Sequence, residues 1–377
     1  MPDSGIEDVF TETTSQSWFS RLGGALTGLL IGLVLVPGSS VLLFWNEGRA
    51  VQTAQSLAEG AGLVLPVERL DRANEGRLVH VSGPARIATP PRDPELGAAV
   101  PEGTIRLLRT VEMFQWREEQ ESETRNKLGG GTETVTTYRY TRGWAEGRID
   151  SSRFRQPDGH QNPNPRQASA GFVAQGVTLN GYRLTDAQLS GLPASERVAP
   201  PNAQGDGVRY IGADPASPRI GDLRITWSAA RPEAISVIAA QSGEGFAPYA
   251  TRAGDRLMMV EAGRRTPAEM FRAAEEGNVF LTWILRVVGA VLMFVAFALL
   301  MRPVRVLADI IPPLGALVGF GTALVAGVAT MLLAPSVIAV AWLFYRPLIA
   351  IGVLALGIAA AWGLTRLRRK APAARPA

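Results

Sequence analysis

An uncharged stretch near the start of the chain constrains its fold most. Between Arg21 and Glu47 lie 25 residues without a charge, 22–46. About 20 apolar residues suffice to cross the hydrocarbon core of a bilayer as a helix, so this stretch is long enough for a tilted span. The preceding tail is acidic and no small-residue cleavage site follows. We therefore expect a membrane anchor rather than a cleaved signal peptide.

The last quarter of the chain is apolar again and predicts three more helices. The four transmembrane helices are expected at 22–45, 281–301, 314–341 and 347–365. Pro335 can kink or end the third of them. A loop at 302–313, a turn at 342–346 and a basic tail at 366–377 complete this region.

Arginine and lysine near short loops predict the orientation. Arg21, Arg302, Arg305 and the basic tail fall on one side, and only Arg346 lies in the opposite short loop. We therefore expect the tail 1–21 and the C-terminus in the cytoplasm, and the large domain outside it. The abundance of Arg, Ala, Gly and Pro indicates a bacterial genome, and hence a bacterial inner membrane with the domain in the periplasm.

The segment 46–280 is predicted to be this extracytoplasmic domain, mainly β (α+β) with a helical stalk at each end. Strand patterns occur at 78–83, 104–116, 133–144, 220–228, 234–241 and 256–261. The second and third flank a glycine-rich turn and predict a long hairpin. Loops are expected at 155–170 and 191–206. The stalks are 47–60 and a helix that starts with a Thr266–Glu269 capping box.

The composition offers little for catalysis. The absence of cysteine from the sequence removes disulfides and thiolate sites. His80 and His160 have no metal-ligand partner at helical spacing, so structural roles are expected. The acidic run 118–123 is either a cation site or a solvated strand end. We expect no catalytic, metal or cofactor-binding residue, and no nucleic-acid partner, because basic residues are mixed with acidic ones.

Glycines recur at four-residue spacing in two of the predicted spans. These are Gly24, Gly28 and Gly32 in the first span, and Gly315 and Gly319 in the third. Small residues at this spacing let helix backbones approach closely, which predicts helix packing and self-association. The alternative is chance, since the chain has 40 glycines.

The end of the first helix and the 342–346 turn should lie on the same outer surface. Both are rich in aromatic residues, as is typical of a membrane interface. Each offers one charge, which predicts an interface ion pair between Glu47 and Arg346. The alternative is that each charge anchors its own helix among the headgroups. Arg286 is expected to snorkel toward water.

Six short motifs occur along the chain in a fixed order. They are NEGRA (46–50) with SLAEG (56–60), NEGRLVH (74–80), VEMFQW (111–116), GDLR (221–224) and WLFYRPL (342–348). In this order they resemble the LUMA family, the transmembrane protein 43 family. The resemblance implies one helix, a large lumenal domain and three further helices. Eukaryotic members lie in the endoplasmic reticulum and inner nuclear membrane, where they self-associate and organise the envelope. No catalytic residues are defined for the family.

Two functions follow as expectations. The first is a non-enzymatic membrane scaffold that self-associates and organises membrane or envelope proteins. Its expected partners are the lipid bilayer, further copies of the chain and other membrane proteins. The alternative is an envelope enzyme or a lipid-handling protein with its site at the domain–membrane boundary. A polar cluster from distant segments, lining a pocket near the bilayer, would favour the second.

Overall fold

The computed structural model describes residues 8–97, 100–199 and 207–348, with positions 350–352, 355–357, 359 and 362. The chain divides into two compact units. The β unit comprises 1–15, 56–125 and 133–274, and the helix unit comprises 16–55, 126–132 and 275–377.

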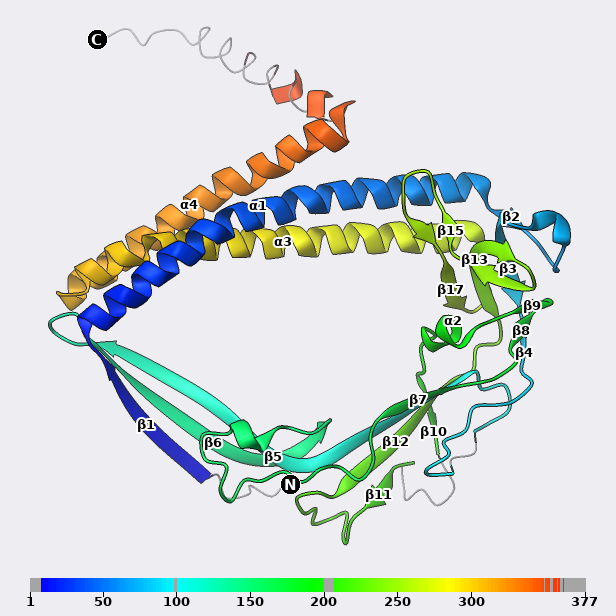
Figure 1. Ribbon diagram of the computed structural model, residues 1–377, viewed down its shortest axis with the longest axis horizontal. Helices are drawn as coiled ribbons and strands as arrows, with labels where there is room; N and C mark the ends of the chain where they lie inside the picture. Colours follow the sequence, from blue (N-terminus) through cyan, green and yellow to red (C-terminus); the bar gives the residue numbers. More distant parts are fainter. Residues whose placement is uncertain are drawn as a thin grey trace, which may run out of the picture. The chain divides into compact units, whose positions relative to one another are not determined.

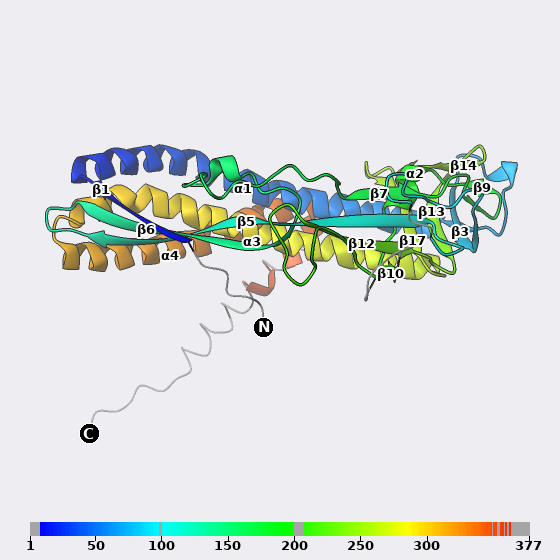
Figure 2. The same ribbon diagram turned by 90° about the horizontal axis from the view of Figure 1, so that it is seen from below.

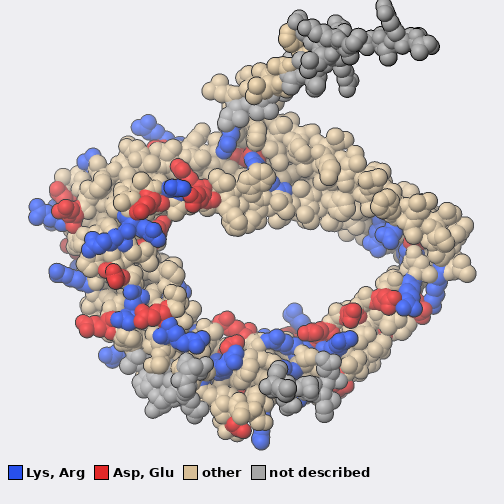
Figure 3. All heavy atoms as spheres, turned by 180° about the vertical axis from the view of Figure 1, so that it is seen from behind, with Lys and Arg blue, Asp and Glu red and all other residues tan. Residues whose placement is uncertain are grey.

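Three long helices dominate the helix unit and lie side by side there (Figures 1 and 2). They are α1 (Trp18–Leu63), α3 (Pro267–Ala308) and α4 (Pro312–Tyr345). Each is long and apolar enough to cross a membrane. The surface of these helices carries few charged side chains (Figure 3). The predicted fourth helix, 347–365, is described at about half of its positions, which are helical, and its other positions and all of the basic tail 366–377 lie outside the described residues.

The helices are longer than the predicted spans. The segments 22–45 and 281–301 form the middle of uninterrupted helices of 46 and 42 residues, and the predicted stalks continue them. The loop predicted at 302–313 shrinks to 309–311, and α4 passes through Pro335 to Tyr345. Helical hydrogen bonding continues past the apolar residues, so hydropathy located the middles of the helices and not their ends.

The β unit is built on two main sheets among the described residues. The larger sheet has the order β1-β6-β5-β12-β10, with β11 also paired to β12 and β7 to β5. Its strands are β1 (Asp8–Gln16), β5 (Arg106–Asn126), β6 (Thr132–Glu146), β7 (Ala170–Val173), β10 (Glu196–Val198), β11 (Arg209–Ile211) and β12 (Leu223–Ala230).

The smaller main sheet has the order β14-β13-β3-β2, with β17 on β13. Its strands are β2 (Leu65–Pro66), β3 (Leu78–Gly83), β13 (Ile235–Ser242), β14 (Gly245–Ala247) and β17 (Met259–Ala262). Minor ladders join β4 (Ala85–Arg86), β8 (Thr178–Leu179) and β9 (Tyr182–Arg183), and join β15 (Tyr249–Ala250) to β16 (Arg256–Leu257). A short helix, α2 (Asp186–Ser190), follows β9.

The predicted hairpin is confirmed as β5 and β6. The first half of β5 alternates buried and part-buried residues, and it pairs with β12 so that Leu107, Val111 and Met113 reach a core around Trp227. This is the period of two expected for a strand packed on one face. The loop predicted at 191–206 is partly wrong, because β10 within it pairs with β12.

The segment 8–16 of the N-terminal tail forms a strand, which the sequence did not predict. β1 pairs with β6 in the sheet that also holds β5 and β12. The cytoplasmic location expected for this tail stays a prediction.

The inner ends of the two predicted stalks are built into the core of the β unit. Leu57 of α1 packs with Met270 and Phe271 of α3 against Leu78 and Ile238. The predicted capping box at the start of α3 is confirmed. The Glu269 backbone N–H donates to the Thr266 hydroxyl at 3.3 Å, and the Thr266 N–H donates to the Glu269 carboxylate at 2.8 Å.

Candidate functional site

A buried carboxylate on α1 organises the polar centre of the helix unit. Arg286 of α3 donates to both oxygens of Glu47, from Nε at 2.6 Å and from Nη2 at 2.8 Å. The Trp342 indole of α4 donates to the same carboxylate at 2.9 Å. The Glu47 side chain is 1% exposed and that of Arg286 17%. These three residues, called the Glu47 cluster, join all three long helices.

Aromatic rings surround the cation of this cluster. The Arg286 guanidinium lies 4.8 Å from the ring centre of Trp283 and 6.0 Å from that of Trp342. A planar guanidinium makes a bidentate bond to a carboxylate and still stacks on rings, which an ammonium cannot do. Arg286 is thus held from two sides, and the predicted snorkelling toward water is wrong.

A second polar network lies beside this cluster on α1 and α3. Arg49 donates to the Asn278 side-chain oxygen at 3.0 Å and to the Thr282 hydroxyl at 2.9 Å. Asn46 donates to the Thr282 carbonyl at 3.1 Å, and Asn278 donates to the Ala50 carbonyl at 3.0 Å. Such groups are costly in an apolar setting unless bonded, and here they bond across α1 and α3.

Aromatic contacts bring the end of α4 against α1 beside this cluster. Phe44 has its ring centre 5.6 Å from that of Phe344 and 5.3 Å from that of Tyr345. Gly48 lies directly beneath the Tyr345 ring, where a Cβ would clash. The two aromatic segments predicted to share one surface therefore do meet. Their charges pair differently, since Glu47 bonds Arg286 and Trp342 and not Arg346.

A pocket of about 390 Å³ opens beside the Glu47 cluster. Its walls come from all three long helices and from the end of α4: Ala50, Ala54, Glu275, Asn278, Val279, Thr282, Trp283, Arg286, Trp342 and Arg346. Polar residues from distant segments thus line a pocket beside apolar helices, which is the feature expected to favour a lipid-handling site.

The other end of the helix unit carries a second buried ion pair. Arg21 of α1 pairs with Asp309, which is 1% exposed and follows α3. The tip of the β5–β6 hairpin joins this pair: Arg21 donates to the Gly130 carbonyl, and Asn126 donates to Asp309 at 3.3 Å. The Trp18 indole donates to the Val306 carbonyl at 3.0 Å. Arg21, Asp309, Asn126 and Gly130 are called the Asp309 cluster.

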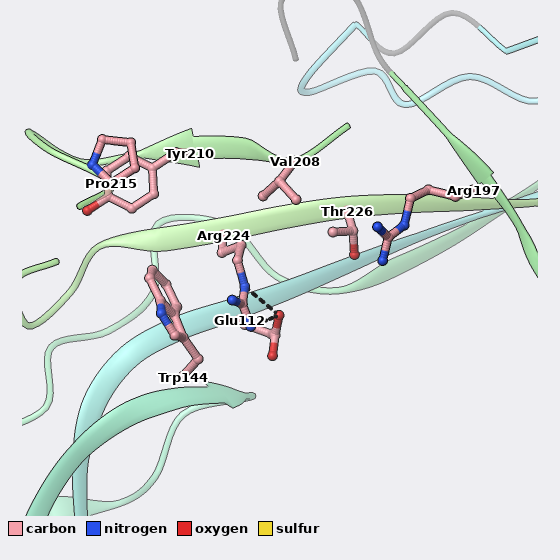
Figure 4. A pocket seen from close by; sticks show the side chains of 8 residues that line it. All are labelled: Glu112, Trp144, Arg197, Val208, Tyr210, Pro215, Arg224 and Thr226. Carbon is pink, nitrogen blue, oxygen red and sulfur yellow. Dashed lines mark hydrogen bonds and ion pairs between the residues drawn. The ribbon is translucent and has the colours of Figure 1, made fainter. Parts of the chain in front are cut away.

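The β unit has a pocket of its own, of about 450 Å³ (Figure 4). Arg224 of β12 and Glu112 of β5 point toward each other there and pair at 2.9 Å. The Arg224 guanidinium also lies 4.9 Å from the Trp144 ring centre. Tyr210 donates to Asp222, and this bond and burial raise the pKa of the Tyr210 hydroxyl. Glu112 and Arg224 thus satisfy each other across neighbouring strands, and Arg197 also lines the pocket.

The comparisons with known proteins agree on one family. A family model described as Transmembrane protein 43 matches residues 113–347. Transmembrane protein 43 of Homo sapiens is 33% identical over 378 residues, which cover 93% of this chain and 93% of the human protein. The chain belongs to the transmembrane protein 43 family. The homolog from Drosophila melanogaster is 31% identical over 345 residues, covering 87% of this chain and 91% of the fly protein. No solved structure matches the chain.

For this member of the transmembrane protein 43 family, two motifs that suggested the resemblance build the Glu47 cluster and the network beside it. NEGRA supplies Asn46, Glu47 and Arg49, and WLFYRPL supplies Trp342 and the aromatic residues that face α1. Sequence reasoning missed Arg286 as the partner. A signal was available: Asn278, Thr282 and Arg286 recur every four residues, which places them on one face of a helix.

The predicted glycine stripes pack helices within this single chain. A Cβ on Gly32 would come within 2.8 Å of the Ala296 carbonyl oxygen of α3, and Gly28 faces Leu299 of α3. Gly315 lies against Asp309 and Gly319 against Arg305, both from the end of α3. Gly24 has no atom near its Cβ position among the described residues. Of the stripe Gly24, Gly28 and Gly32, only Gly24 faces away from the described residues.

Both histidines lie in the β unit and bond to backbone carbonyls. His80 has its Nε2 2.8 Å from the Arg265 carbonyl, and burial lowers its pKa. His160 stacks on Tyr140 at 4.0 Å between ring centres, with its Nδ1 2.9 Å from the Gln156 carbonyl. Burial and a bond to Glu118 raise the pKa of Tyr140 to about 12. These contacts are those of structural core residues.

Proposed function

We propose that this protein is a non-enzymatic membrane scaffold that self-associates through the apolar faces of its helices. The observation that carries the proposal is the pairing inside the helix unit. Glu47 is bonded by Arg286, and Asp309 by Arg21, so both buried carboxylates tie helices together. Ionisable groups inside a membrane bundle that serve transport or chemistry must remain available to a substrate, whereas these are already bonded within the chain.

The surface available for self-association is apolar and extensive. Large side chains on all three helices are exposed, such as Leu30 at 63%, Val34 at 71% and Phe320 at 71%. Lipid, another copy or another membrane protein can cover such a surface. Gly24 lies on this surface of α1 and is open, so another helix can approach its backbone closely there.

Substitutions at two glycines test the assembly. Gly24→Leu is expected to reduce the fraction of oligomer, because a bulky side chain on an open face keeps a second copy at a distance. Gly32→Leu is the matched control: it clashes with α3 and should lower the Tm of the monomer. Mass photometry of the full-length protein in mild detergent measures the first effect. A Gly24→Leu variant with the size distribution of the wild type would contradict assembly through this face.

The proposed location is an integral membrane protein with the β unit in one compartment outside the cytoplasm. β1 pairs with β6, whereas a single crossing by α1 would put 8–16 across the bilayer from the residues that follow α1. Ser15→Cys and Ser152→Cys, both at exposed positions in a chain without cysteine, decide between the two. If α1 crosses once, a membrane-impermeant maleimide should label Ser152→Cys alone in intact cells. Labelling of both variants would support the paired sheet and contradict a single crossing by α1.

The pocket beside the Glu47 cluster favours a second candidate function, lipid handling. It lies between apolar helices at the level of two tryptophans, which is typical of the membrane interface. A scaffold and a lipid-binding protein are not exclusive, but they make separate predictions. Assembly depends on the exposed helix faces, whereas lipid handling depends on the residues that line the pocket.

A further inference from the structure

The pocket beside the Glu47 cluster holds two charged side chains that the cluster does not bond. They are Arg346, which follows the end of α4, and Glu275 on α3. Within the part of the chain that the structure describes, neither side chain forms a hydrogen bond or an ion pair. Glu47 already accepts hydrogen bonds from Arg286 and Trp342, and Arg286 already has its carboxylate. Arg346 and Glu275 are therefore the charges that can meet a ligand.

The tryptophans indicate that this pocket lies at the depth of the lipid headgroups in a bilayer. Trp283 is 59% exposed beside the pocket, and Trp342 lines its wall. Indoles prefer the headgroup level, where one edge meets water and the ring meets acyl chains. Toward the Asp309 end, α3 continues with exposed apolar residues such as Val287 and Val291. A ligand here would have its polar part in the pocket and its apolar part along the helices.

We propose that the pocket binds the headgroup of a zwitterionic phospholipid with a primary ammonium group, of which phosphatidylethanolamine is the simplest. Arg346 donates to the phosphodiester oxygens, and Glu275 accepts from the ammonium group. A volume of about 390 Å³ lies within the range of sites that hold small ligands. This inference rests on the second candidate function, lipid handling, and is independent of self-association.

The charge balance of the pocket selects this headgroup class. Glu47 and Arg286 neutralise each other, and the charges of Glu275 and Arg346 also sum to zero. An anionic headgroup such as phosphatidylglycerol would leave the Glu275 carboxylate without a cation. A choline headgroup carries a cation but has no N–H to donate, so it loses the hydrogen bond. The primary ammonium satisfies both requirements.

Native mass spectrometry of the full-length protein tests the proposal. The protein is released from nanodiscs with equal amounts of phosphatidylethanolamine, phosphatidylcholine and phosphatidylglycerol. The wild type should retain phosphatidylethanolamine about tenfold over the other two, and Arg346→Gln should lower that retention about tenfold. Glu275→Gln should keep binding but lose the preference among headgroups. Arg252→Gln, at an exposed position of the β unit, is the control and should change nothing.

Three results would overturn the proposal. They are equal retention of the three lipids by the wild type, full retention by Arg346→Gln, and a preference for phosphatidylglycerol.

Inorganic phosphate is tested separately in lipid-free detergent. If phosphate raises the Tm of the protein as much as phosphatidylethanolamine does, the site binds phosphate and not a lipid. Arg346→Lys keeps the charge and should retain the lipid. Should Arg346→Gln fail to fold, Glu275→Gln carries the test: it should retain the three lipids equally, and an unchanged preference for phosphatidylethanolamine would overturn the proposal. Failure of lipid binding leaves the assembly test of Gly24→Leu unaffected.

Discussion

Each end of the helix unit contains a buried arginine–carboxylate ion pair, but the two pairs have different surroundings. At one end Glu47 pairs with Arg286, and at the other Arg21 pairs with Asp309. The two α1 residues are 26 positions apart, or about 39 Å along a helix. The first pair joins only helices and borders a pocket between two tryptophans. The second is covered by the tip of a β-hairpin.

This difference separates two roles for charge in one bundle. The Asp309 cluster holds a loop and a hairpin tip, so its polar groups are already bonded within the chain. The Glu47 cluster leaves Arg346 and Glu275 beside it. An arginine near the end of an apolar helix can thus be a structural partner, as Arg21 and Arg286 are, whatever it indicates about topology.

The largest effect is expected from breaking the first pair. Arg286→Met leaves the Glu47 carboxylate buried without its cation, which costs about 3–5 kcal/mol in the free energy of unfolding. Arg346→Met is the matched control and should cost under about 1 kcal/mol, since it removes no direct bond. Chemical unfolding in mild detergent measures both. Equal losses for the two variants would show that the two arginines share the carboxylate.

A smaller effect is expected at the other end. Asp309→Ala leaves Arg21 without its carboxylate, but the Arg21 side chain is 14% exposed and water can reach it. We expect a loss of about 2 kcal/mol, below the range for fully buried pairs. Hydrogen exchange of residues 126–132 should rise at the same time, because Asn126 loses its acceptor. Unchanged exchange at the hairpin tip would mean that Asp309 does not hold it.

The smallest effects compare one asparagine from each end. Asn278→Ala removes two bonds across α1 and α3 and should cost about 1–2 kcal/mol. Asn126→Ala removes a single long bond at 3.3 Å and should cost under about 1 kcal/mol. Unfolding under the same conditions ranks them. The reverse order would place the tighter network at the hairpin tip.

Features with a local cause could be predicted from the sequence. The hairpin followed from two strand-like runs around a glycine turn, and the capping box followed from Thr266 and Glu269 three residues apart. The meeting of 44–49 with 342–347 followed from topology alone, because both end an apolar run on the same side. These predictions needed no knowledge of which side chains face each other.

Features that depend on helix rotation could not be predicted so directly. Glu47 has two arginines at a similar depth, and only the rotation of α3 decides that Arg286 faces it. The recurrence of polar residues at 278, 282 and 286 marks that face, but its partner helix is visible only in three dimensions. β1 gave little signal, since the strand is largely polar and exposed and sits next to a membrane helix.

A charge-exchange cycle tests whether Glu47 closes the bundle with Arg286. Glu47→Arg and Arg286→Glu should each lower the free energy of unfolding by about 3 kcal/mol or more, and the double exchange should restore most of it. The exchange of Glu47 with Arg346 in the same assay should restore none. Recovery with Arg346, and none with Arg286, would show that Glu47 pairs with Arg346 instead.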